Sequence, residues 1–244
     1  MLAPRATGTC AGSLEVVSEH GMLTIAGPET ISVGGFTNPA SAARGLLHAV
    51  IQLLMAARPD LLWLHAGAVA CAGRALILSA ASGQGKSTVA GELLARGWSY
   101  LSDEIAPIDP TSCTVLPFPI TPYKRVSQKQ GLSNAEVLRL DKVRVDIHRD
   151  AVSTLAVPVE RVYFLSYAPH ARAVQLIDCS PAAAVIEALR NSLGSSTFRE
   201  VELRALCELM SRVAGTHLSY ASAPDVADQI GFFGRSLNSE QIGG

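Results

Sequence analysis

Residues 80–88 read Ala-Ala-Ser-Gly-Gln-Gly-Lys-Ser-Thr, a pattern of small residues, lysine and hydroxyls that suits polyphosphate binding. Gly83 and Gly85 let backbone N–H groups turn towards one point, where a following helix N-terminus adds its dipole. Lys86 would then bridge the β- and γ-phosphates, and the Ser87 hydroxyl would ligate Mg²⁺. The segment therefore predicts a phosphate-binding loop (P-loop). The residues expected to hold the nucleotide are Ala80, Ala81, Ser82, Gly83, Gln84, Gly85, Lys86, Ser87 and Thr88.

The flanking sequence predicts the elements that must position such a loop. Residues 75–79 are apolar and indicate a buried strand, and residues 86–96 indicate a helix that ends at Gly97. A strand, a glycine-rich loop and a helix in this order form the usual setting of a P-loop. Ala80 replaces the first glycine of the pattern, which is tolerable where φ is negative. The alternative is a chance Gly/Ser-rich turn before a helix.

Two adjacent acids, Asp103 and Glu104, follow the next predicted strand, residues 100–102. In an α/β sheet the edge at which that strand ends faces the ligand crevice. A carboxylate there would take the proton of an acceptor hydroxyl, hold Mg²⁺, or do both through water. An exposed acidic turn has the same pattern, so spacing alone leaves both interpretations open.

His65 lies in the apolar segment 61–69, which predicts a strand antiparallel to residues 75–79. Ala72-Gly73-Arg74 is the expected turn between the two strands. A single histidine on an apolar strand is more often a core residue than a catalytic one. The local pattern therefore favours a core position for His65.

The block from Leu64-His65-Ala66-Gly67 through residues 79–88 to Leu101-Ser102-Asp103-Glu104 resembles the catalytic domain of HPr kinase/phosphorylase. It is most similar to the shorter HPr-kinase-like proteins, which include kinases encoded with lasso-peptide biosynthetic genes. The resemblance covers residues 61–110. It implies the α/β fold of phosphoenolpyruvate carboxykinase-like nucleotide binders, a P-loop core with a mixed sheet and flanking helices.

The resemblance also implies roles for individual residues. Asp103 or Glu104, the latter an Asp in the family, would be the base towards a serine hydroxyl; Asp103 is favoured, with Glu104 as the second carboxylate. Lys86 would be catalytic, His65 would lie near the acids or phosphates, and Ser87 and Asp103 would be metal ligands. The family's C-terminal metal-binding Glu, phosphorolytic Arg and separate N-terminal domain have no counterpart by motif. The resemblance therefore does not extend to reverse phosphorolysis or to HPr as acceptor.

Together these features predict an ATP- and Mg²⁺-dependent kinase that phosphorylates a serine of a protein or peptide. A ribosomally made precursor peptide of the lasso type is one candidate acceptor. The alternatives are a nucleotide-sensing P-loop module without an acceptor and a kinase of a small hydroxylated metabolite. The sequence does not distinguish ATP from pyrophosphate as donor, and it is compatible with a homo-oligomer.

The composition of the 244 residues, 48% hydrophobic and 17% charged with a net charge of −1, predicts a globular protein without a basic field for nucleic acid. Five cysteines without a Cys-x-x-Cys pair favour reduced thiols in the cytoplasm. The apolar residues 46–57 are too few to span a membrane. The expected division is a flexible tail (1–13), a small strand and helix segment (14–60), a catalytic core (61–234) and a second tail (235–244).

Three weaker motifs remain. Residues 173–178 form an apolar run ending in Asp178, as in a Walker B strand, although many hydrophobic strands end in Asp. Lys124-Arg125, in the long loop predicted over residues 111–135, would hold phosphate or an acidic peptide, or form a solvated basic turn. His148-Arg149-Asp150 lacks the Asn of a protein-kinase catalytic loop and is rejected.

Overall fold

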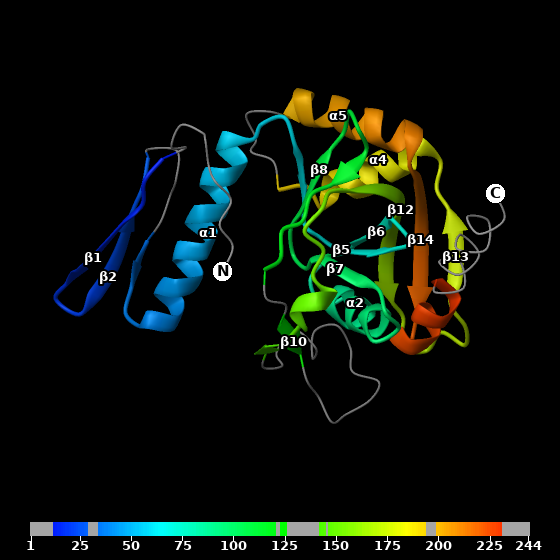
Figure 1. Ribbon diagram of the computed structural model, residues 1–244, viewed down its shortest axis with the longest axis horizontal. Helices are drawn as coiled ribbons and strands as arrows, with labels where there is room; N and C mark the ends of the chain where they lie inside the picture. Colours follow the sequence, from blue (N-terminus) through cyan, green and yellow to red (C-terminus); the bar gives the residue numbers. More distant parts are fainter. Residues whose placement is uncertain are drawn as a thin grey trace. The chain divides into compact units, whose positions relative to one another are not determined.

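A computed structural model describes residues 12–28, 34–120, 123–125, 142–144, 146–193 and 199–230 of the chain (Figure 1). The expected tails, residues 1–13 and 235–244, lie outside these ranges apart from residues 12 and 13. The chain divides into two compact units, Met1–Leu61 and Leu62–Gly244. None of the helices in the described ranges combines the length and apolar character that a membrane crossing requires.

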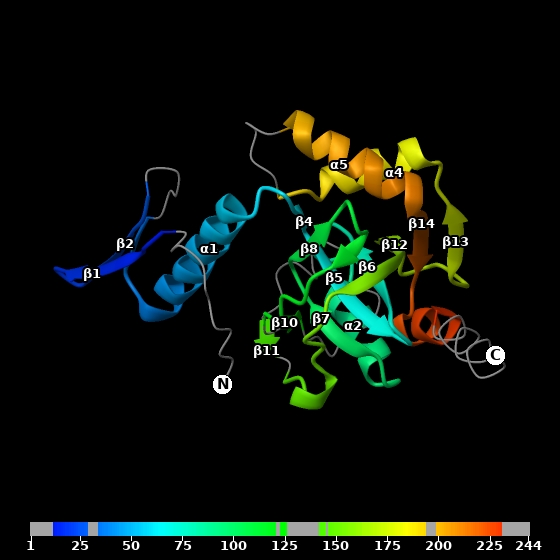
Figure 2. The ribbon, with the colours of Figure 1, turned by 45° about the horizontal axis from the view of Figure 1, so that its top comes forward.

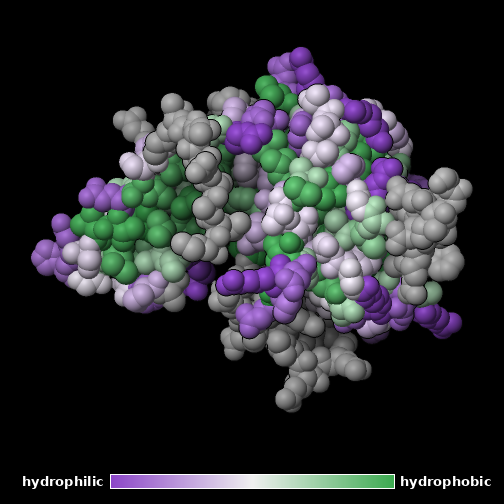
Figure 3. Space-filling view, viewed as in Figure 1, coloured by the Kyte–Doolittle hydropathy of each residue, from purple (hydrophilic) through white to green (hydrophobic). Residues whose placement is uncertain are grey.

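The N-terminal unit consists of a small antiparallel sheet and one helix. Its elements are β1 (Glu15–Glu19), β2 (Met22–Ala26), β3 (Gly35–Phe36) and α1 (Pro39–Ala57). The Asn38 side chain accepts a hydrogen bond from the Ser41 N–H at 2.8 Å and caps α1, with Pro39 at the start of the helix. Apolar side chains gather on the surface of this unit (Figure 3). Those exposed on α1 are Leu47, Val50 and Leu54.

The C-terminal unit is built on one mixed sheet of nine strands. The strands are β4 (Leu62–Leu64), β5 (Ala66–Cys71), β6 (Arg74–Ser79), β7 (Ser99–Ser102), β8 (Ala106–Asp109), β9 (Thr114–Val115), β12 (Val157–Tyr167), β13 (Gln175–Asp178) and β14 (Ala214–Tyr220). Strands β6, β12 and β14 are parallel, whereas β5 is antiparallel to both β6 and β7. The predicted α/β fold with a mixed sheet is therefore confirmed.

Strand β12 connects the two halves of this sheet. Its first residues pair antiparallel with β9, and the rest of the strand runs parallel to β6 and β14. The register against β6 shifts between Val159 and Arg161. Such an irregularity bends a strand, which lets one long strand serve both halves.

Helices cover both faces of the sheet (Figure 2). On one face α4 (Pro181–Arg190) and α5 (Arg199–Arg212) enclose a core that includes Ala75 and Ile77 of β6. On the other face α2 (Lys86–Leu94) and the helical residues 223–230 enclose a core that includes Leu76 and Leu78. Because successive side chains of a strand point to opposite faces, one short apolar run of β6 supplies both cores.

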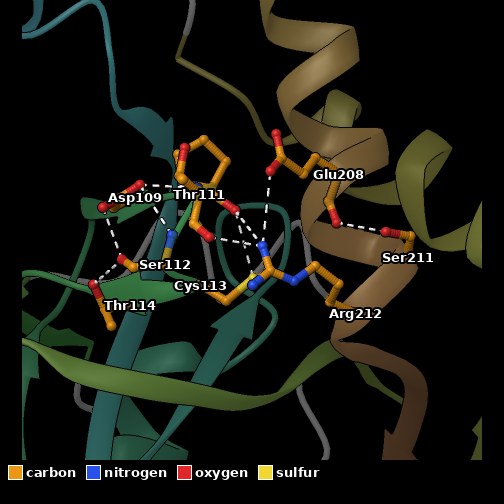
Figure 4. A network of polar contacts seen from close by, with 9 residues as sticks. Asp109, Thr111, Ser112, Cys113, Thr114, Glu208, Ser211 and Arg212 are labelled. Carbon is orange, nitrogen blue, oxygen red and sulfur yellow. Dashed lines mark hydrogen bonds and ion pairs between the residues drawn. The ribbon is translucent and has the colours of Figure 1, made fainter.

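The turn between β8 and β9 is fastened to the end of α5 (Figure 4). The Asp109 carboxylate accepts hydrogen bonds from the Thr111 N–H at 2.9 Å and the Ser112 hydroxyl at 2.7 Å. The guanidinium of Arg212, at the end of α5, donates to the Thr111 carbonyl at 2.7 Å. The hairpin that follows the two adjacent acids is thereby tied to the helical layer.

Several elements differ from the sequence-based expectations. The region predicted as a long loop contains β9 and β10 (Tyr123–Arg125), and β10 pairs with β11 (Lys142–Arg144). A short 3-10 helix spans Arg149–Ala151. The helical residues 223–230 were not predicted.

Candidate functional site

The loop of residues 80–85 connects β6 to α2 and contains two left-handed glycines. Gly83 and Gly85 both have a φ of +88°, a conformation that any other residue adopts only with strain. Ala80 does not belong to the described residues with a positive φ, so the missing first glycine does not strain the loop. The replacement is therefore compatible with the loop conformation.

Helix α2 presents an N-terminus suited to an anion. Gly85 is its N-cap and makes no side-chain capping bond, and the first turn carries no acidic residue. An uncapped helix start offers backbone N–H groups and the positive end of the helix dipole to a bound anion. This feature alone does not identify the ligand, but it places an attractive potential next to the loop.

The tip of the loop is held by the ends of two neighbouring strands. The Tyr220 hydroxyl, at the end of β14, donates to the Gln84 carbonyl at 2.7 Å. The Tyr167 N–H, at the end of β12, donates to the Gln84 side-chain oxygen at 2.7 Å. Burial raises the pKa of Tyr220, so its hydroxyl stays protonated and remains a donor. Gln84 is thus fixed at both of its oxygens.

Lys86 and His65 connect the loop to the acidic corner. The Lys86 ammonium group, 7% exposed as a residue, donates to the Ala80 carbonyl at 2.6 Å and lies 3.1 Å from Nε2 of His65. Because lysine has only donors, Nε2 accepts, and Nδ1 carries the hydrogen that it donates to the Glu104 carbonyl at 2.9 Å. The hydrogen-bond network therefore assigns the Nδ1–H tautomer to His65.

His65 lies at a break between two strands rather than within one. Strand β4 ends at Leu64 and β5 begins at Ala66. The His65 N–H donates to the Asn191 carbonyl at 2.6 Å, outside the sheet ladder. The prediction of one continuous strand over residues 61–69 is wrong at this residue. The break leaves the imidazole half-buried, where it meets Lys86 instead of the apolar core.

Asp103 and Glu104 are adjacent in sequence but have different environments. Asp103 is 1% exposed and accepts a hydrogen bond from the Ser87 hydroxyl at 2.7 Å. Glu104 is exposed and has a φ of +88°. Holding a non-glycine residue in that region costs about 1–3 kcal/mol, and such strain is concentrated at functional sites. One acid thus faces the first turn of α2 and the other faces solvent.

The strand that leads to this corner is fixed by buried hydrogen bonds. The Ser102 hydroxyl, fully buried at the end of β7, shares its single hydrogen between the carbonyls of Ile105 and Phe118. The first bond closes the corner around the two acids. The second attaches the segment after β9, because the Phe118 N–H also donates to the Leu101 carbonyl at 2.9 Å.

The structure thus brings together five residues that the sequence singled out. A continuous set of hydrogen bonds joins His65, Lys86 and Glu104, and a second links Ser87 to Asp103. Reasoning from sequence missed the contributions of Tyr167 and Tyr220. Neither tyrosine lies in a motif, so no local pattern identifies it.

Asp178 does not belong to this site. Strand β13 runs antiparallel to β14, so its last residue points away from the edge at which β6 ends. Three strand spacings of about 4.8 Å separate β13 from β6, or about 14 Å. The Asp178 carboxylate accepts hydrogen bonds at 2.7 Å from Thr216 and Arg161, which hold its pKa below the usual range. The Walker B interpretation is therefore wrong.

Among the residues that the structure describes, a metal ion would find only part of its ligands. Within the described ranges, no group of three or more His, Cys, Asp or Glu residues has the arrangement of a metal site. Ser87 and Asp103 would supply two oxygens beside the loop. This small donor set fits Mg²⁺, which keeps several waters and binds through substrate phosphates.

Comparison with known proteins finds no matching protein family and no matching curated protein. A solved structure titled HPr(Ser) kinase/phosphatase from Coxiella burnetii aligns with 74% of this chain and 99% of that chain. The two share 10% sequence identity and a TM-score of 0.39. A likeness this distant assigns no activity, which has to be inferred from the site itself.

Proposed function

We propose that the protein is a kinase that binds ATP with Mg²⁺ in the loop between β6 and α2 and phosphorylates a serine of a protein or peptide. The observation that carries the proposal is the hydrogen bond from Ser87 to the buried Asp103. It sets a carboxylate against the first turn of the helix that would bind the phosphates. A loop that only bound an anion would have no need of that carboxylate.

The chain's residues fit the nucleotide and the metal. Two left-handed glycines and an uncapped helix start favour a polyphosphate, and Lys86 supplies a cation at the same point. Ser87 and Asp103 would hold Mg²⁺ through their oxygens. Mg²⁺ held there would supply positive charge to neutralise the charge that develops on the transferred phosphoryl group.

In this proposal the residues hold the reactants in line and move one proton. Asp103 accepts the proton of the serine hydroxyl as the serine oxygen bonds to the γ-phosphorus. The bond from that phosphorus to the bridging oxygen breaks, and ADP leaves with its electron pair. Lys86 stabilises the charge on the transferred group, and Glu104 is the second carboxylate beside the acceptor.

Intact mass spectrometry of acceptor peptides tests the proposal. A panel of serine peptides is incubated with the protein, ATP and Mg²⁺, and a peptide should gain one phosphoryl group. Lys86→Ala should abolish the gain, because it removes the cation on the phosphates. Asp103→Asn should leave ATP binding in place and remove transfer.

The outcomes separate the alternatives. Near-normal transfer by Asp103→Asn would show that Asp103 is not the base. Release of ADP without any phosphorylated peptide would contradict the peptide kinase and support a nucleotide-sensing module. A lasso-type precursor peptide belongs in the panel, as the sequence resemblance suggests it as acceptor.

A further inference from the structure

Strands β12 and β14 extend past the end of β6 on one side of the loop. The pairing of β12 with β6 ends where Phe164 lies opposite Ser79, whereas its pairing with β14 continues to Tyr167 and Tyr220. Three residues of a strand span about 10 Å, so both strands continue beyond the start of the loop by that length. Their last side chains are two tyrosines whose rings pack edge to face, with centroids 5.8 Å apart. Tyr220 is buried but Tyr167 is only half-buried, so Tyr167 is the member of this pair that a ligand can reach.

The side-chain amide of Gln84 lies against the same two strand ends. The Tyr167 N–H donates to it at 2.7 Å, and because an N–H group only donates, the amide atom at that position is the oxygen. The Tyr220 hydroxyl holds the backbone carbonyl of Gln84 at the same time. The amide nitrogen makes no hydrogen bond to any residue in the described ranges. An aromatic ring and an amide with unused hydrogens are therefore adjacent at the tip of the loop.

The other side of the loop has different chemistry. Strand β7, which leads to the two acids, lies two strand spacings from β6, and β14 lies two spacings away in the opposite direction. At about 4.8 Å per spacing, the two strands lie about 10 Å to either side of β6. A nucleoside triphosphate carries its γ-phosphate at one end and its base at the other. In the proposed reaction the γ-phosphate faces Asp103, which leaves the side of β12 and β14 for the nucleoside.

We propose that Tyr167 and Gln84 form the subsite for the base of the nucleotide. The base stacks on the accessible part of the Tyr167 ring, and the amide hydrogens of Gln84 donate to acceptor atoms of the base. An aromatic ring suits this role because every base has a π-face. The inference rests on the proposed function and names the donor as a nucleoside triphosphate rather than pyrophosphate, which has no base to place there.

Isothermal titration calorimetry with Mg²⁺ and without an acceptor tests the subsite in the absence of transfer. One ligand is ATP, and its twin is ribose 5-triphosphate, which has the same phosphates and sugar but no base. ATP should bind roughly ten-fold more tightly, because stacking of a base on an aromatic ring contributes about that factor. Since the phosphate charge is the same in both ligands, the difference in affinity reports on the base alone.

Three variants locate this difference on the two residues. Tyr167→Leu removes the ring and should lower ATP affinity roughly ten-fold, while the affinity for ribose 5-triphosphate stays unchanged. Tyr167→Phe is the matched control, because it keeps the ring and should keep the ATP affinity. Gln84→Glu keeps both oxygens that the strand ends hold but loses the amide hydrogens. Its added charge weakens both ligands alike, so the expected effect is a smaller ratio of the two affinities.

Several results would overturn the base subsite. One is equal affinity for ATP and ribose 5-triphosphate in the unmodified protein, a comparison that requires no variant to fold. Another is an unchanged ratio of the two affinities in Tyr167→Leu, which would place the base elsewhere. Loss of both ligands in Tyr167→Leu would make the ring a support of the loop only. Base-dependent binding without transfer to any peptide would refute only the kinase, whereas transfer together with equal affinities would refute only the subsite.

Discussion

Gly85 and Tyr220 are predicted to be energetically coupled at the tip of the β6–α2 loop. A Cβ built on Gly85 would lie 2.1 Å from the Tyr220 hydroxyl oxygen and 3.3 Å from Cζ of the same ring. The backbone φ of Gly85 is +88°. Gly85→Ala therefore meets two separate penalties, one from its own backbone and one from displacing the hydroxyl that is bonded to Gln84.

The two penalties have different sizes. A left-handed backbone costs an alanine about 1–2 kcal/mol. Displacing the Tyr220 hydroxyl removes a buried hydrogen bond and leaves polar atoms unsatisfied, which costs about 1–3 kcal/mol. Gly85→Ala should lower the free energy of unfolding by about 3 kcal/mol in the unmodified protein. In a Tyr220→Phe background only the backbone penalty and a tight ring contact remain, so the coupling should be about 1–2 kcal/mol.

A double-mutant cycle measures this coupling. Both tryptophans, Trp63 and Trp98, belong to the C-terminal unit, so urea unfolding followed by their fluorescence reports on that unit alone. The four proteins are the unmodified chain, the two single variants and the double variant. Strictly additive effects would refute the reasoning, because they would mean that the alanine methyl group and the hydroxyl do not compete for space.

Two further predictions concern stability. Burial raises the pKa of Tyr100 and Tyr220 above their ordinary value of 10.0. Above pH 10.0 the unfolded tyrosines lose protons that the folded ones keep, so the free energy of unfolding should fall as the pH rises. The urea midpoint should therefore fall with pH in the unmodified protein, and it should fall less steeply in Tyr220→Phe. Arg212→Ala removes the bond to the Thr111 carbonyl and should cost about 1 kcal/mol in urea unfolding, while Arg204→Ala on the same helix should stay within about 0.5 kcal/mol. Equal effects of the two arginine variants would show that the β8–β9 turn does not depend on α5.

The sequence predicted the elements whose determinants are local. The apolar residues of β6, the glycines after it and the helix from Lys86 follow one another in the chain, and each has a pattern of its own. The turn between β5 and β6 was predicted for the same reason. Ala72 and Gly73 adopt φ values of +50° and +71°, the pattern of a two-residue hairpin turn. The cap of α4 is equally local, because the Ser180 side chain accepts a hydrogen bond from the Ala183 N–H three residues on.

Features that depend on distant residues were not predictable. The strand break at His65 coincides with a bond to the Asn191 carbonyl, and an apolar segment gives no sign of such a partner. The Tyr220 hydroxyl reaches Gln84 across 136 positions of sequence. For Asp178 the local pattern suggested a role that the structure contradicts. The pattern matches a Walker B strand, but the antiparallel course of β13 takes Asp178 away from the loop.

The two hydrogen-bond connections across the site have a common geometry. Lys86 and Ser87 are consecutive in the first turn of α2, and Asp103 and Glu104 are consecutive at the corner after β7. Ser87 bonds directly to Asp103, and Lys86 reaches the Glu104 carbonyl through His65. Two neighbouring residues of α2 are thus joined to two neighbouring residues of the acidic corner. Two connections restrict rotation of the corner relative to the helix more than a single connection would.

This pairing has a consequence for the proposed reaction. A group that binds phosphate and a group that faces the acceptor must keep their separation to a fraction of an ångström for efficient transfer. Here the strained backbone of Glu104 is held by the same imidazole that contacts Lys86. Under the proposed function, His65 acts by position. It holds the acidic corner at a set distance from the phosphates, and it does so with a neutral ring that adds no charge to either side.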